Sequence, residues 1–178
     1  MKMDRSWMLR TAAAIFATAA VLPIAAATAS ASTLPTNTAT AAAVAEFIEC
    51  SEGSLSVKVN TTTKAVTGTG TATDCVAQVN PAYTSATITI SGTATTIGGL
   101  AIKTVTTDTI KWNTGQTTTV AVTRNYYGAS GVSAVGVGNT TGGLFHPAGE
   151  FDNGAGTRST SAGVITLNNE LQLIVSTS

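Results

Sequence analysis

The chain has 178 residues and carries nine basic and nine acidic side chains, so its formal net charge is zero. Charged residues make up only 10 % of the sequence, against about 25 % in an average soluble protein. Because a nucleic-acid-binding protein needs a concentrated basic face that displaces counterions, this composition argues against nucleic acid as a partner. It argues equally against binding to an anionic membrane surface.

The first 31 residues have the organisation of an export signal. Lys2, Arg5 and Arg10 form a basic start, an alanine-rich apolar run follows, and A-x-A cleavage patterns close the run. We therefore expect a signal peptide over residues 1–31 and a secreted, extracellular protein. A retained membrane anchor is the alternative, although the apolar run is shorter than the roughly 20 residues that a spanning helix needs.

Cleavage would leave about 147 residues, enough for one domain and hardly for two. Three basic residues and one acidic residue lie in the signal, so the mature chain has a net charge of about −2. Residues 32–43 consist mainly of Ser, Thr, Ala, Asn and Pro and predict a flexible N-terminal lead-in. Residues 44–178 are expected to form a single β-domain, with no stable membrane span after cleavage.

A period of two, typical of half-buried β-strands, dominates the mature sequence. Residues 54–60 alternate, with Leu55, Val57 and Val59 on one face and polar side chains on the other. Residues 41–50 fit either a short helix or a first strand, and we favour the strand. Further strands are expected over residues 66–73, 84–96, 100–112, 117–127, 132–138 and 164–176.

About eight to ten strands are predicted, with no long helical pattern after residue 50. Threonine is abundant and supplies polar side chains that also favour strands. The pattern favours an antiparallel β-sandwich of immunoglobulin-like or jelly-roll-like type, with a closed β-barrel as the alternative.

Two cysteines, Cys50 and Cys75, remain after cleavage. An even pair in an exported chain predicts one disulfide, while two free thiols or a metal pair are the alternatives. A bond that closes a loop of about 26 residues would contribute roughly 3 to 4 kcal/mol through the unfolded state.

Residues 142–163 form the most irregular stretch of the sequence, and Asp152-Asn153-Gly154 is interpreted as a turn. The single histidine of the chain, His146, lies here with Glu150 and Asp152, which makes this region a possible functional loop. It contains no nucleophile elbow and no EF-hand spacing, so we assign no catalytic residue, no metal ligand and no cofactor.

Aromatic residues are few, and Trp112, Tyr126 and Tyr127 form a possible binding surface. Adjacent residues of a strand point to opposite faces, so only one of the two tyrosines can belong to the core. The other is expected to be an exposed anchor or a cross-strand partner.

Residues 109–119 place a tryptophan, a glycine turn and a threonine-rich return strand in succession. With the alternating Thr-Gly stretch over 67–71 and the segment Gly149-Glu150-Phe151, this resembles small exported Thr/Gly-rich β-proteins of actinobacteria. Most proteins of that kind have no assigned activity. The resemblance implies an exported bacterial β-protein and no particular site.

The sequence thus favours a non-enzymatic module of the extracellular space or cell envelope that binds a protein or a cell-surface polymer. One alternative is a secreted protease inhibitor that uses residues 142–156 as its inhibitory loop. Another is a secreted hydrolase built around His146, Asp152 and a serine. The oligomeric state stays open.

Overall fold

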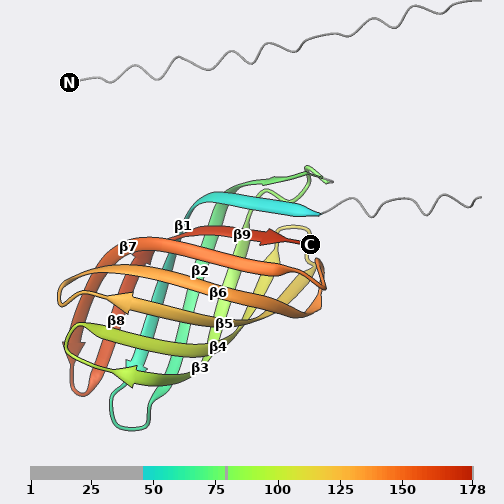
Figure 1. Ribbon diagram of the computed structural model, residues 1–178. Coiled ribbons are helices and arrows are strands. Elements are labelled where there is room, and N and C mark those ends of the chain that lie inside the picture. Colours follow the sequence, from blue (N-terminus) through green and yellow to red (C-terminus); the bar gives the residue numbers. More distant parts are fainter. Residues whose placement is uncertain (1–45, 79, 178) are drawn as a thin grey trace, which may run out of the picture. The chain divides into compact units, whose positions relative to one another are not determined.

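Nine β-strands make up most of the described chain, residues 46–78 and 80–177, in the computed structural model (Figure 1). The signal predicted over 1–31 and the lead-in predicted over 32–43 lie outside the described residues. The strands are β1 (Phe47–Asn60), β2 (Ala65–Ala77), β3 (Ala86–Ile97), β4 (Ala101–Trp112), β5 (Thr117–Tyr127), β6 (Gly131–Gly143), β7 (Gly149–Ser161), β8 (Val164–Glu170) and β9 (Gln172–Ser176).

The sheet formed by these strands closes on itself. From β1 to β8 each strand pairs antiparallel with the next, and β1 pairs with β2 along one edge and with β8 and β9 along the other. Strands β8 and β9 follow one another around Leu171, and both pair with β7. The all-β antiparallel class is confirmed, and the architecture is the closed barrel that stood as the alternative to the sandwich.

Six strands form one side of the barrel wall. The start of β1, then β9, β7, β6, β5 and β4 lie side by side across it, in the order of their hydrogen-bonded pairing (Figure 1). We call this side the front wall. Its inner face covers the barrel core and its outer face meets solvent.

The barrel core follows the period of two along the strands. Leu55, Val57 and Val59 are buried, as the alternation predicts. At one end of the barrel three aromatic rings, from Tyr83, Trp112 and Phe145, pack edge to face with centroids 5.6–6.0 Å apart. This end of the core is therefore filled by side chains.

Strand β7 corrects the expectation of a long loop over residues 142–163. It runs from Gly149 to Ser161, so the turn predicted at Asp152-Asn153-Gly154 lies inside a strand. Its glycines permit a close approach of β8: a Cβ at Gly154 would lie 1.8 Å from the carbonyl oxygen of Glu170, and one at Gly156 1.9 Å from that of Asn168. Glycine here marks tight strand contact instead of a loop.

The predicted disulfide is present. Cys50 on β1 and Cys75 on β2 are register partners with Cα atoms 3.9 Å apart, and their sulfurs are bonded. Such a bond is typical of an oxidising environment. Within residues 46–78 and 80–177, no helix has the length and apolar character needed to cross a membrane.

Candidate functional site

An arginine and three acidic side chains meet inside the barrel. Arg124 of β5 lies 2.6 Å from the carboxylate of Asp108 on β4 and 2.6 Å from that of Asp152 on β7, measured from Nη2. Glu150 Oε1 lies farther away, at 3.9 Å. All four residues are at most 4 % exposed. The barrel therefore encloses an ion cluster that links three of its strands.

Further hydrogen bonds fix the guanidinium group. Arg124 Nε donates to Asp152 Oδ2 at 2.8 Å, and Nη1 donates to Thr106 Oγ1 at 3.4 Å. Thr106 Oγ1 in turn donates to Asp108 Oδ1 at 2.8 Å. Charge-assisted bonds of this kind hold both partners in place, since a buried charge without a partner is costly.

Two glycines of β6 make room for the cluster. In the strand register Gly136 lies between Arg124 and Asp152, so the ion pair crosses over a residue that has no side chain. A Cβ at Gly136 would lie 2.5 Å from both carboxylate oxygens of Asp152. One at Gly138 would lie 2.8 Å from Glu150 Oε2. The inward face of β6 thus complements the acids of β7.

Burial and charge set the protonation of the cluster. Burial lowers the pKa of Arg124, but the charges of Asp152 and Asp108 together outweigh it and raise that pKa above its ordinary value. Burial, reinforced by the charge of Asp152, raises the pKa of Glu150 to about 10. Glu150 is therefore protonated at neutral pH, and the guanidinium faces the carboxylates of Asp108 and Asp152.

The cluster is built for structure. A catalytic acid or base has to reach a substrate, and these side chains are enclosed by the barrel wall. Each of the three guanidinium nitrogens also contacts an oxygen of a neighbouring side chain. The side chains that can reach a partner therefore lie on the outer surface.

The structure separates the residues of the predicted aromatic surface. Trp112 and Tyr126 are buried in the core, whereas Tyr127 is 56 % exposed. The indole nitrogen of Trp112 donates to Thr118 Oγ1 at 2.9 Å inside the barrel. Because side chains alternate along β4 and β5, these three residues do not share one exposed face.

The structure also separates the residues of the predicted functional loop. Glu150 and Asp152 point into the barrel from β7, while His146 is exposed in the turn before it. His146 Nδ1 lies 3.2 Å from Thr140 Oγ1 and 3.0 Å from the carbonyl oxygen of Thr140. Since Asp152 is engaged by Arg124, it does not orient the histidine.

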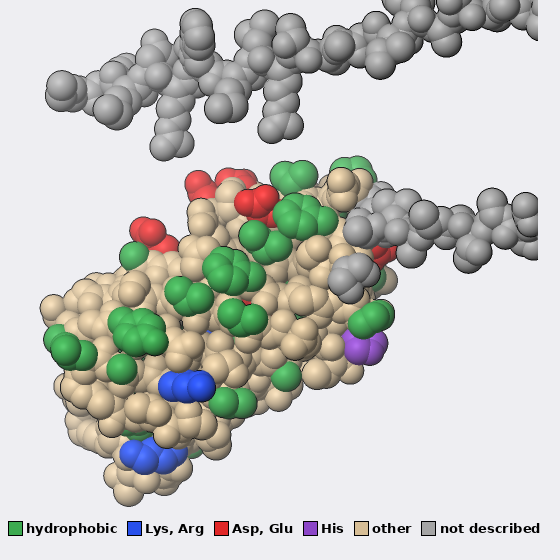
Figure 2. Space-filling view, viewed as in Figure 1, with side chains coloured by type: hydrophobic (Ala, Val, Ile, Leu, Met, Phe, Trp, Pro, Cys, Tyr) green, Lys and Arg blue, Asp and Glu red, His purple; other side chains and the backbone are tan. Residues whose placement is uncertain are grey.

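The outer face of the front wall carries the largest exposed apolar side chains of β4, β6 and β7. Register pairs join one row directly across the strands. We call it the apolar row, and it consists of Val105, Thr123, Val137, Phe151 and Ile174. Val137 is 60 % exposed and Phe151 39 %. Figure 2 shows apolar side chains across the middle of this surface, with acidic groups at its upper edge.

A second outward-facing row runs beside the apolar row, displaced from it by two residues along each strand. It consists of Lys103, Asn125, Val135, Asn153 and Gln172. Val135 is 40 % exposed and adds to the apolar surface. The remaining uncharged members of this row offer amide groups to solvent.

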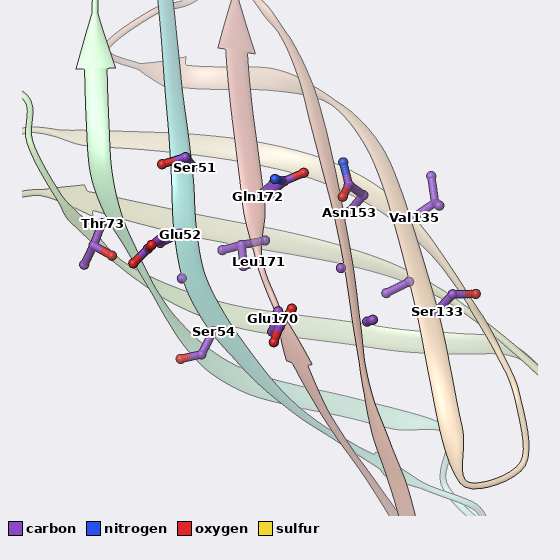
Figure 3. Close-up of a pocket in the computed structure, with 14 residues that line it drawn as sticks. Ser51, Glu52, Ser54, Thr73, Ser133, Val135, Asn153, Glu170, Leu171 and Gln172 are labelled. Atoms are coloured by element: carbon purple, nitrogen blue, oxygen red, sulfur yellow. The ribbon is translucent and has the colours of Figure 1, made fainter. Parts of the chain in front are cut away.

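An open groove adjoins the front wall where β8 gives way to β9 (Figure 3). Its volume is about 920 Å³, and three residues of the second row, Val135, Asn153 and Gln172, belong to its lining. Polar side chains from β1, β7 and β9, such as Glu52, Asn153 and Gln172, surround it. The groove therefore extends the outer surface with groups that donate and accept hydrogen bonds.

Sequence reasoning missed Arg124, Asp108 and the apolar row, although the odd or even position of each residue along its strand assigns it to the inner or the outer face. Arg124 shares its parity with Val120, Val122 and Tyr126, which places a charge at a core position. Val135 and Val137 share a parity on β6, and their common face is the outer one. A charged residue at a position that alternation assigns to the core was the signal that could have revealed the cluster.

Comparison of the chain with family models, with curated proteins and with solved structures found no match, so the site is inferred from the described residues alone.

Replacing Gly136 with alanine should destabilise the fold by about 2 kcal/mol or more, because the added methyl group displaces the Asp152 carboxylate from Arg124. Gly142→Ala on the same strand is the matched control, since a Cβ there meets nothing within 4 Å. It should change stability by less than about 0.5 kcal/mol. Denaturant unfolding of both variants measures the difference, and equal effects would contradict the packing described here.

Glu150 should make stability fall as pH rises. Between its ordinary pKa of 4.5 and its folded pKa of about 10, the folded protein keeps a proton that the unfolded chain releases. Stability is therefore greatest below the unfolded pKa and declines toward the folded one, by up to about 1.4 kcal/mol per pH unit. Glu150→Gln should flatten this decline. Unfolding free energies from about pH 5 to about pH 9 test it, and parallel profiles would show that Glu150 does not titrate this way.

Proposed function

We propose that the protein is a secreted, non-enzymatic interaction module of the extracellular space or cell envelope, and that it binds another protein through its front wall. The observation that carries this proposal is the apolar row, in which Val137 and Phe151 are exposed side by side and Val105 is exposed two strands from Val137, across Thr123. Contiguous exposed apolar side chains on a soluble domain are typical of protein-binding surfaces. A protein surface fits this row better than a polar polymer does.

Export is supported by two independent features. The first 31 residues have the pattern of a cleaved signal, and Cys50 and Cys75 form a disulfide. The content of charged residues is low, and threonine hydroxyl groups on the outer surface can hydrogen-bond to water in their place.

The alternatives have less support. A protease inhibitor acting through residues 142–156 would need an exposed loop there, but β6 and β7 occupy most of this stretch. A hydrolase around His146 and Asp152 would need the two side chains to act together. Asp152 is instead bound to Arg124 inside the barrel.

Site-specific photo-crosslinking tests the proposed surface. With p-benzoylphenylalanine in place of Phe151, the protein exported into culture should crosslink to a protein when irradiated, because the ring lies in the contact. The same group in place of the exposed Thr89 on β3 is the matched control and should give little crosslinking. Immunoblots of the medium and of washed cells measure both.

Two results would contradict the proposal. Equal crosslinking from residues 151 and 89, or none from either, would show that the front wall is not a preferred contact surface. Retention of the unprocessed chain inside the cell would remove the export that the proposal requires.

A further inference from the structure

The charged residues of the front wall lie at its two opposite ends. Lys103 is exposed in the second row on β4, with Lys111 eight residues farther along that strand, and Glu49 and Glu52 are exposed on β1. Among the described residues, the outward positions that register pairing places between these ends carry no charge. The surface thus has a basic edge (Lys103), an apolar middle and an acidic edge (Glu49 and Glu52). On the face shown in Figure 2, basic side chains lie in the lower part and acidic side chains at the top.

This distribution is complementary to itself. The strand order β4, β5, β6, β7, β9, β1 places three strands on each side of a line between β6 and β7. A two-fold axis along that line, lying in the plane of contact, brings β4 of one copy against β1 of the other. Lys103 then faces the acidic edge of the second copy, at both ends of the contact.

The same axis also matches the apolar middle. It brings β6 of one copy against β7 of the other, so Val137 of one copy contacts Phe151 of the other. Both apolar side chains are then removed from contact with water. A two-fold axis running across the strands would instead place Lys103 of one copy near Lys103 of the other, and the two acidic edges near each other. Charge therefore selects one orientation, as in isologous dimers with complementary edges.

We infer that the protein bound by the front wall is a second copy of this chain, joined in a two-fold symmetric dimer. This inference rests on the proposed function, because it names the partner of the same surface. The apolar row supplies the buried contact, and the Lys103 to Glu49 and Glu52 contacts at the rim set the orientation.

Charge reversal tests the dimer with the purified, disulfide-bonded protein. Lys103→Glu makes both edges acidic, and the double variant Glu49→Lys, Glu52→Lys makes both edges basic. Each variant alone should dimerise at least about tenfold more weakly than the wild type, because like charges meet at both ends. An equimolar mixture of the two should associate again, because every contact then joins opposite charges.

Sedimentation velocity and light scattering over about 1–100 µM measure the association. Lys111→Glu is the matched control, since Lys111 is exposed on the same strand but outside both rows, and it should dimerise like the wild type. Val137→Thr should weaken the dimer without changing any charge. Near-ultraviolet circular dichroism checks that each variant is folded.

A wild type that stays monomeric over this range would overturn the inference. So would charge variants that dimerise like the wild type, or a mixture that fails to associate while both variants are folded. If the wild type is monomeric but residue 151 still crosslinks to a different protein in culture, the proposed function stands and the second copy is not the partner.

Discussion

The ion pair between Arg124 and Asp152, crossing over Gly136, is the constraint on which the front wall depends. A guanidinium inside a barrel is tolerated only when carboxylates accompany it, and Asp108 and Asp152 come from two different strands. A slip of one residue in β5 or β7 would turn one charge outward and leave its partner buried alone. The cluster therefore fixes the register of β4 to β7 in a way that interchangeable valines would not.

That register decides what the outer surface contains. Because successive residues of a strand point to opposite faces, an inward Glu150 and Asp152 force Phe151 outward. On β6 the inward positions opposite these acids are Gly136 and Gly138, so Val135 and Val137 also face solvent. The apolar row and the buried cluster are thus two sides of the same strands, and the exposed apolar surface follows from the charged core.

Local pattern was enough to predict much of this fold. The alternation of Leu55, Val57 and Val59 gave the correct inner face, and the Asn113 to Gly115 turn joins two real strands. Closure of the barrel depends on the pairing of β1 with β8, between residues more than a hundred positions apart, for example Val57 and Leu167. A sandwich and a barrel share the same alternation, so no local signal separates them.

The candidate site was harder to predict for two physical reasons. The glycines of β7 suggest a loop in sequence, but they serve the close approach of β8. Asp108 of β4 and Arg124 of β5 are surface residues by type, whereas their parity places them in the core. Giving parity more weight than residue type would have identified Arg124 and Asp108, whereas Asp152 lies on a strand that its glycines conceal.

Carboxyl-group footprinting tests most directly whether the acids of β4 and β7 face inward. The folded protein is treated with a carbodiimide and a small amine, and the modified residues are identified by mass spectrometry. The exposed side chains of Glu49, Glu52 and Glu170 should be modified, while Asp108, Glu150 and Asp152 should react only after unfolding. Modification of Asp152 or Glu150 in the folded protein would show that β7 faces the other way, and would contradict both the buried cluster and the apolar row.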